Sequence, residues 1–141
     1  PPELDIWRVI ERAPLLQAFL ETPEGNDLLQ GYRRLTHILQ SLPQEEVIPP
    51  LSPSLFTAPE QTLYQALGIV QQATSSLGES ITDFQKHLTL LATLRSPLDA
   101  FFEGVLVACP EATLRRNRQA LLEVVRSCYE HLCAFAYLEG S

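Results

Sequence analysis

The sequence predicts an all-α fold, a bundle of about six to seven helices. Apolar residues recur at intervals of three and four along most of the chain, and no stretch alternates convincingly between apolar and polar residues as a half-buried strand does. Four prolines interrupt the helical pattern between residues 41 and 58. We therefore expect a single helical domain over residues 1–141, with a proline-rich connection at about 41–58.

Before this connection, the prolines and caps divide the chain into three helical segments. The first is expected over residues 3–13, and Pro14 is expected to begin a new helix that continues to about Thr22. The next occupies residues 23–40, where Asn26 or Asp27 can cap the first turn. Its buried face is predicted from apolar residues at helical spacing: Leu28, Leu29, Tyr32, Leu35, Ile38 and Leu39.

Two helices are expected directly after the connection. One covers residues 59–78, with Pro59 in its first turn and Gly78 at its end. The other covers residues 80–95 and carries its apolar residues on one side.

Two more helices complete the predicted bundle. One is expected over residues 96–107, where the first turn has Ser96 as cap, Pro97 in the first helical position and Asp99 as the acid of a capping box. The last helix is expected from about residue 111 to residue 138.

Charge and composition exclude several classes of protein. The chain has a formal net charge of -7, and its ten basic residues are nine arginines and one lysine. This excess of acid argues against non-specific coating of nucleic acid but permits recognition by a few well-placed arginines. No apolar run approaches the roughly 18 residues of a membrane span. The chain contains no Met, so we expect it to be a piece of a longer protein.

A family resemblance is carried by "SPLDAFFEGVLVACPEATLRRNRQALL", residues 96–122. This segment resembles the C-terminal end of the beta subunit of bacterial-type heterotetrameric glycyl-tRNA synthetase. The matching residues are Pro97, Asp99, Phe101, Phe102, Glu103, Val105, Val107, Arg115, Asn117, Arg118, Leu121 and Leu122. "GYRRLTHIL" resembles the family's earlier basic helix, with His37 in place of the usual Asn, and "SLFTAPEQTLYQAL" resembles a further segment.

The same region is also similar to a second, more distant group. "ATLRRNR" is similar to the DALR signature of the helical anticodon-binding domains of arginyl- and cysteinyl-tRNA synthetases. Two departures stand out. In "CPEAT" the acid that usually precedes the "LR" helix is not clearly recognisable, and the end "CAFAYLEGS" lacks the usual Ala-Asp-x-Ser.

The resemblance implies a DALR-type anticodon-binding domain at the C-terminus of the beta chain. In that enzyme the alpha chain makes glycyl-adenylate from ATP and glycine and charges the tRNA, while the beta chain supplies tRNA recognition. The implied partners are therefore tRNA(Gly), the other domains of the beta subunit and the alpha subunit, in the cytoplasm or an organelle interior. No cofactor is expected in this domain, since ATP and Mg serve the whole enzyme. The alternative is a helical protein–protein docking or scaffold domain without direct RNA contact.

A helical wheel of the last helix separates its arginines. Arg118 falls inside the apolar sector, Arg115 lies at its edge, and Arg116 points away. A buried guanidinium needs a partner, so we expect Arg118 to form a structural ion pair with Asp99 or Glu103 on the preceding helix.

Five other arginines are the candidates for RNA contact, because a planar guanidinium can fork onto a phosphate or stack on a splayed base. Asn117 is instead expected to bridge backbone groups. Convergence of the candidates on one face would favour RNA, whereas dispersed arginines beside an exposed apolar patch would favour a protein partner. The candidates are Arg33, Arg34, Arg95, Arg115 and Arg116.

No catalytic or metal site is expected. Cys128, His131 and Cys133 are close in sequence, but on one helix their directions diverge and no second cluster completes a tetrahedral site. The odd number of cysteines and the lack of a CxxC motif suit a reducing compartment.

Overall fold

The computed structural model describes residues 6–43, 49–78 and 80–130, and within these ranges the chain is helical without a strand. The predictions of an all-α fold and of about six to seven helices are confirmed. The elements are α1 (Ile6–Leu20), α2 (Pro23–Ser41), the short 3-10 helix η1 (Pro53–Leu55), α3 (Ala58–Ser75), α4 (Ile81–Ala92), α5 (Arg95–Gly104) and α6 (Ala112–Glu130).

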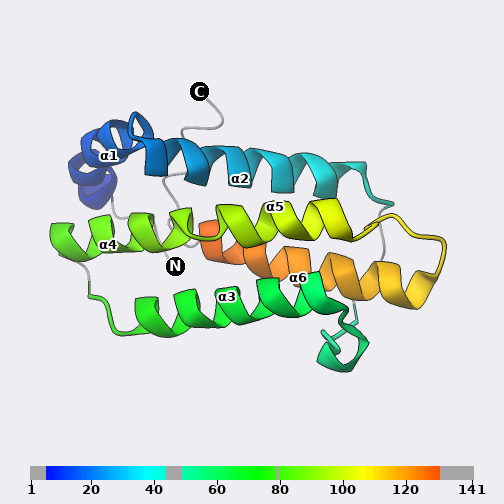
Figure 1. Cartoon of the computed structure of the whole chain (residues 1–141). Coiled ribbons are helices and arrows are strands. Elements are labelled where there is room, and N and C mark those ends of the chain that lie inside the picture. The colour runs from blue at the N-terminus through cyan, green and yellow to red at the C-terminus, as the bar shows by residue number, and fades with distance from the viewer. Residues whose placement is uncertain (1–5, 44–48, 79, 131–141) are drawn as a thin grey trace.

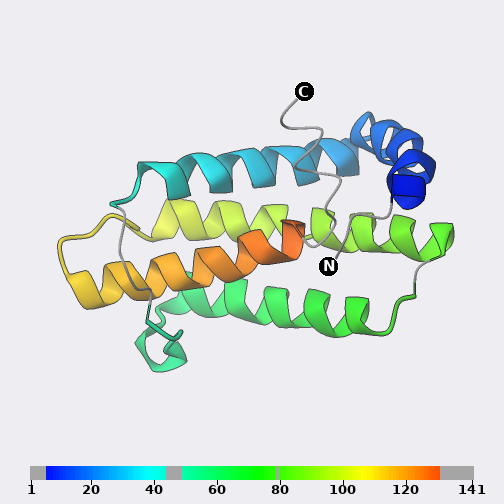
Figure 2. The same ribbon diagram turned by 180° about the vertical axis from the view of Figure 1, so that it is seen from behind.

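The helices pack in layers. α4 and α5 follow one another almost end to end through the middle of the bundle, with α2 on one side of them and α3 on the other (Figure 1). α6 runs antiparallel to α2 and packs against both α2 and α3 (Figure 2). α1 crosses the end of the bundle and contacts α2 and α4.

One apolar core joins these layers. Every α-helix contributes at least one side chain with little or no exposure to solvent. The largest of these residues are Leu16, Leu28, Leu35, Leu63, Leu67, Leu88, Leu98, Phe101, Leu121 and Tyr129. Burial of this apolar surface is the main favourable contribution to the stability of the fold.

Two predicted features of the N-terminal helices are wrong. Pro14 does not begin a new helix but lies inside α1. Proline has no backbone N–H to donate, and the complete burial of Leu16 in the core stabilises the helix despite this missing hydrogen bond. α2 is capped neither by Asn26 nor by Asp27. The hydroxyl of Thr22 accepts a hydrogen bond from the Gly25 amide at 3.0 Å, because Pro23 favours the first helical turn and moves the cap ahead of it.

The later helix boundaries agree with the sequence in part. Pro59 lies in the first turn of α3, as predicted, but the helix ends at Ser75 rather than at Gly78. The first turn of α3 contains a capping box, in which the Glu60 carboxylate accepts hydrogen bonds from the amide and hydroxyl of Thr57.

The predicted start of α5 is also wrong. Ser96 does not cap this helix, which begins at Arg95 after Leu94. Leu94 is fully buried, and its carbonyl accepts the first helical hydrogen bond from Leu98, so core packing sets the boundary. The Asp99 carboxylate consequently serves no capping box and is bonded to arginine side chains instead.

The proline-rich connection is held down by the last helix. The side-chain amide of Asn117 on α6 donates to the Ser52 carbonyl at 3.1 Å and accepts from the Ser52 amide at 2.7 Å. Asn117 therefore bridges backbone groups as expected, and it pins the connection to the bundle. Residues 44–48 lie outside the described part of the chain, as does the predicted extension of α6 from residue 131 to residue 138.

Arg118 forms a buried ion pair, but its acid is not the expected one. Its Nε donates to Glu60 Oε1 at 3.2 Å, and its NH1 donates to the Leu106 carbonyl at 2.8 Å. Arg118 is 8% exposed and Glu60 is fully buried. Asp99 is engaged elsewhere and Glu103 is exposed, so the prediction of Asp99 or Glu103 as partner is wrong. The pairing follows from the packing of α6 against α3, which sequence proximity does not indicate.

Among the described residues, no helix combines the length and the apolar character that crossing a membrane requires.

We predict that Arg118→Ala lowers the free energy of unfolding by about 3 kcal/mol or more, because it leaves the Glu60 carboxylate buried without its cation. Urea denaturation followed by circular dichroism measures this loss. Arg116→Ala is the matched control on the same helix, and its exposed side chain predicts a change within about 0.5 kcal/mol. Equal stability of the Arg118→Ala variant and the parent chain would contradict a structural role for this pair.

Candidate functional site

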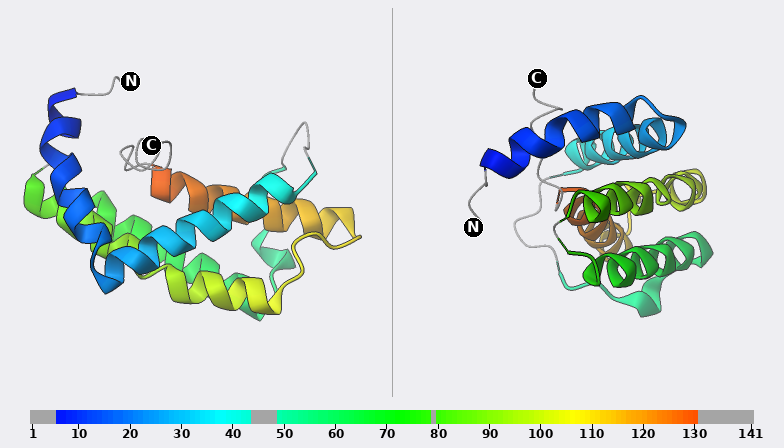
Figure 3. Two further views of the ribbon diagram at one scale, coloured as in Figure 1. Left: turned by 90° about the horizontal axis from the view of Figure 1, so that it is seen from above. Right: turned by 90° about the vertical axis from the view of Figure 1, so that its left-hand side faces the viewer.

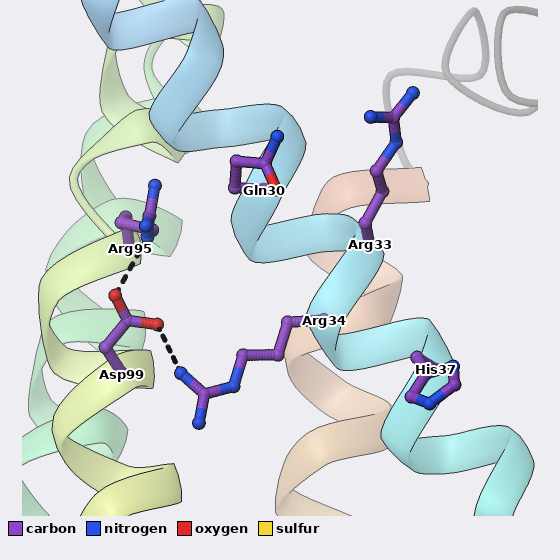
Figure 4. A pocket seen from close by; sticks show the side chains of 6 residues that line it. All are labelled: Gln30, Arg33, Arg34, His37, Arg95 and Asp99. Atoms are coloured by element: carbon purple, nitrogen blue, oxygen red, sulfur yellow. Dashed lines mark hydrogen bonds and ion pairs between the residues drawn. The ribbon is translucent and has the colours of Figure 1, made fainter.

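A shallow polar hollow lies between α2 and α5. Its volume is about 390 Å³, and four of its lining residues come from the outer face of α2 while two come from the first turns of α5 (Figure 4). Their spacing places them together, because residues three or four apart lie on one face of a helix. The lining residues are Gln30, Arg33, Arg34, His37, Arg95 and Asp99.

Asp99 is the centre of the ion pairs in this hollow. Arg34 NH1 donates to Asp99 Oδ1 at 3.1 Å, and Arg95 Nε donates to Asp99 Oδ2 at 2.8 Å (Figure 4). Arg95 also donates through NH1 to Asp27 Oδ1 at 3.1 Å. The hydrogen bond with Asp99 is the main cause of the raised pKa of Arg95. The two guanidiniums are thus oriented by carboxylates on two different helices.

Arg34 has a second anchor. Its guanidinium carbon lies 4.9 Å from the centre of the Phe102 ring, a cation–π contact. Arg33 and His37 are exposed and extend away from Asp99 (Figure 4). The hollow therefore combines two oriented guanidiniums with two basic side chains at its outer edge.

The buried side of α2 fixes the position of these arginines. The Tyr32 ring meets the Tyr129 ring of α6 edge-on, with 5.6 Å between their centroids. The Tyr32 hydroxyl donates to Glu130 Oε2 at 3.2 Å. A Cβ added at Gly31 would come within 2.8 Å of the Tyr129 hydroxyl oxygen, so glycine allows α2 and α6 to approach closely here. Burial is the main cause of the raised pKa of Tyr129, so its phenol stays neutral at physiological pH.

Arg115 and Arg116 lie at the other end of α6. Arg115 is half-buried, and its NH1 donates to the carbonyls of Cys109 and Pro110 at 3.0 and 3.5 Å. Arg116 is exposed. Thirteen residues separate Arg116 from Tyr129, which corresponds to about 20 Å along the helix axis. The arginines at the start of α6 and those of α2 therefore do not converge.

The start of α6 also resolves one departure from the family pattern. The Glu111 carboxylate accepts hydrogen bonds from the amides of Thr113 and Leu114, both at 3.2 Å. This is the position and the chemistry of a helix N-cap. An acid thus caps the "LRRNR" helix here, although "CPEAT" obscures it in the sequence.

The structure brings together three of the five predicted RNA contacts, namely Arg33, Arg34 and Arg95. Sequence reasoning did not identify Gln30 and His37 as neighbours of these arginines. The signal was available, because Gln30, Arg33 or Arg34, and His37 follow the three-to-four-residue spacing of one helix face. The contribution of Arg95 and Asp99 depends on the packing of α5 against α2, which has no local signal.

The cysteine and histidine cluster falls mostly outside the described residues. Cys128 is half-buried and receives a weak hydrogen bond from Gln71 Nε2 at 3.7 Å, and burial raises the pKa of its thiol. His131 and Cys133 are not described. No group of three or more potential metal-binding side chains occurs in the described part of the chain.

Comparison with known proteins identifies homologues along nearly the whole chain. The chain is 35% identical to the glycine–tRNA ligase beta subunit of Phenylobacterium zucineum, over 96% of this chain and 21% of that protein. It is 33% identical to the beta subunit of Cereibacter sphaeroides and 34% identical to that of Paracoccus denitrificans, over 99% of this chain in both cases. No protein-family model and no solved structure matches the chain.

The chain spans about a fifth of the length of these relatives. The resemblance stated from the sequence is therefore confirmed, and the chain is homologous to one segment of the glycine–tRNA ligase beta subunit.

Proposed function

We propose that this chain is the tRNA-recognition module at the C-terminus of a glycine–tRNA ligase beta subunit, and that the hollow between α2 and α5 contacts the anticodon loop. In this proposal the alpha subunit carries out the ATP-dependent charging of tRNA with glycine, and this segment supplies no catalytic group. Its partners are tRNA(Gly), the other domains of the beta subunit and the alpha subunit. The compartment is that of translation, the cytoplasm or an organelle interior.

The observation that carries the proposal is the clustering of arginines in an acidic chain. Three arginines line the hollow, Arg33, Arg34 and Arg95, and its lining contains one acidic residue, Asp99, so the formal charge of the lining is positive. The chain as a whole has a formal net charge of -7. A local positive site on an acidic body attracts a phosphate backbone at one place and repels it elsewhere.

The hollow also has the chemistry to read a base. Its volume of about 390 Å³ lies within the range of small-ligand sites and accommodates one splayed nucleotide. Glycine anticodons share two cytosines, and the pairing edge of cytosine presents one amino donor and two acceptors. The Asp99 carboxylate between two guanidiniums offers the complementary acceptor and donors.

The competing function is protein docking without RNA contact. In its favour, Arg115 and Arg116 lie apart from the hollow, and Arg115 is engaged with loop carbonyls. The two functions need different surfaces, so measurements on hollow variants separate them.

We predict that the double substitution Arg33→Ala and Arg34→Ala weakens binding of tRNA(Gly) at least tenfold and makes the affinity less dependent on salt, by about one unit of slope for each lost phosphate contact. Filter binding or fluorescence anisotropy over a range of salt concentrations measures both effects. Arg126→Ala is the control, because this arginine lies on α6 outside the hollow and pairs with Glu123. The proposal fails if the parent chain does not bind tRNA(Gly), or if the control variant loses as much affinity as the double variant.

We predict a different effect for Asp99→Asn. Removing a negative charge raises the overall affinity for tRNA, but the altered hydrogen-bonding group reads cytosine less well. The preference for tRNA(Gly) over a version with a swapped anticodon therefore falls about fivefold or more. Parallel titrations with the two tRNAs measure this ratio. The variant remains folded, since its two ion pairs are partly exposed and contribute about 1 kcal/mol or less each. An unchanged ratio would exclude Asp99 from base recognition.

A further inference from the structure

The outer face of α3 has no charged residue. α3 contains a single acidic residue, Glu60, which is buried in the pair with Arg118. We define the outer face by the residues that surround the middle of its exposed arc, all of which are exposed and uncharged. These residues are Gln61, Tyr64, Gln65, Gly68, Ile69 and Gln72.

This composition differs from that of an ordinary solvent-facing helix. Charged residues usually make up about 25–35% of a soluble surface. Here they are replaced by glutamines and by two exposed apolar side chains, Ile69 at 68% and Tyr64 at 38% exposure. Depletion of charge together with exposed aromatic and aliphatic residues is typical of the centre of a protein–protein interface. The absence of cations on this face also makes it unsuitable for RNA.

Gly68 gives an independent indication. It lies in the interior of α3 at the middle of the exposed arc, where glycine is less favourable than alanine. Apart from its chain neighbours and the nearby backbone of its own helix, a Cβ added at Gly68 would meet nothing within 4 Å, so packing in the bundle does not require glycine there. Because Gly68 has no side chain, the surface between Tyr64 and Ile69 is flat, and another backbone can approach it closely.

The outer face of α3 and the polar hollow are on different sides of the bundle. α2 and α3 form the two outer layers, and α4 and α5 lie between them (Figure 3). The arginines of the hollow come from α2 and from the α5 turn that faces α2. One side of the domain can therefore bind protein while the other stays open to nucleic acid.

The size of the face indicates what kind of partner covers it. Contact along the whole of α3, an 18-residue helix about 27 Å long with an exposed strip about 10 Å wide, buries at most on the order of 600 Å² summed over both partners. This is at the low end for interfaces between domains of one chain, and it is below the roughly 1,000 Å² that independent partners need. A covalently tethered partner overcomes this limit because its effective concentration is high.

We propose that the outer face of α3 docks onto an uncharged surface of another domain of the same beta-subunit chain. The relatives that match this chain are about five times its length, so they contain candidate domains for this contact. This inference rests on the proposed function, in that this chain is part of a longer beta subunit, and does not depend on RNA binding by the hollow.

We predict that a thiol placed on this face is protected in the full-length beta subunit. Ile69→Cys reacts with N-ethylmaleimide at the rate of an exposed thiol in the 141-residue chain, and at least tenfold more slowly in the full-length subunit. The reaction is followed by mass spectrometry of the peptide that carries the new cysteine, so the native cysteines do not interfere. Gln40→Cys on α2 is the control, and its rate is the same in both proteins.

Each alternative occupant gives a different result. Equal rates for Ile69→Cys in the two proteins overturn the proposal. Protection that requires added alpha subunit, added tRNA or a high concentration of the 141-residue chain also overturns it, because the occupant is then not the tethered chain. Gln65→Cys provides a second position on the same face if the first variant does not fold.

We predict opposite effects for Gly68→Gln in the two proteins. In the 141-residue chain it raises Tm by about 2–4 °C, because glutamine is the better helix former and its Cβ meets no neighbour. In the full-length subunit the new side chain occupies the flat surface at position 68 and weakens the contact, so the labelling rate of Ile69→Cys increases at least threefold. Thr89→Gln on the exposed side of α4 is the matched control and leaves the labelling rate unchanged. Continued full protection in the Gly68→Gln variant would contradict close approach at this face.

Discussion

The buried contact between Arg118 and Glu60 determines how one end of this bundle is assembled. Glu60 closes the capping box of α3, and Arg118 projects from α6 and also binds the Leu106 carbonyl after α5. One ion pair thus joins the start of α3, the first turns of α6 and the loop between α5 and α6. Because both charges are desolvated, neither is tolerated without the other, and the three segments depend on one another.

The motif that carries the family resemblance is largely a structural one. Within "RRNR", Asn117 holds the proline-rich connection through Ser52, and Arg115 holds the loop carbonyls of Cys109 and Pro110. Arg116 is the member of the motif that is exposed. The connections before α3 and before α6 contain backbone groups that are not hydrogen-bonded within a helix. The side-chain donors at the start of α6 bind some of these groups, which explains why such donors are dense there. Residues that best identify a family are therefore not necessarily those that bind its ligand.

The sequence predicts the local features of this fold and misses those that depend on packing. Helical spacing predicted the helices and the outward direction of Arg33 and Arg34, because these depend on residues within one or two turns. It misjudged Pro14 and Ser96, where burial of Leu16 and Leu94 outweighs the local signals. It also predicted that Arg118 is paired but not with which acid, since Glu60 is 58 residues away. For the same reason, the family motif pointed to Asp99 but not to its place between Arg34 and Arg95.

The two proposed surfaces differ in the physical force on which they depend. Contact at the hollow is mainly electrostatic and weakens as salt screens the guanidiniums, whereas contact at the uncharged face of α3 depends on apolar burial and shape. The middle layer of α4 and α5 separates the two surfaces, and its side chains are packed against both outer layers. Docking through α3 can therefore hold the domain in place without competing for the arginines of α2. In the proposed arrangement, a domain fixed in this way would present the hollow in a defined orientation, which would lower the entropic cost of binding RNA there.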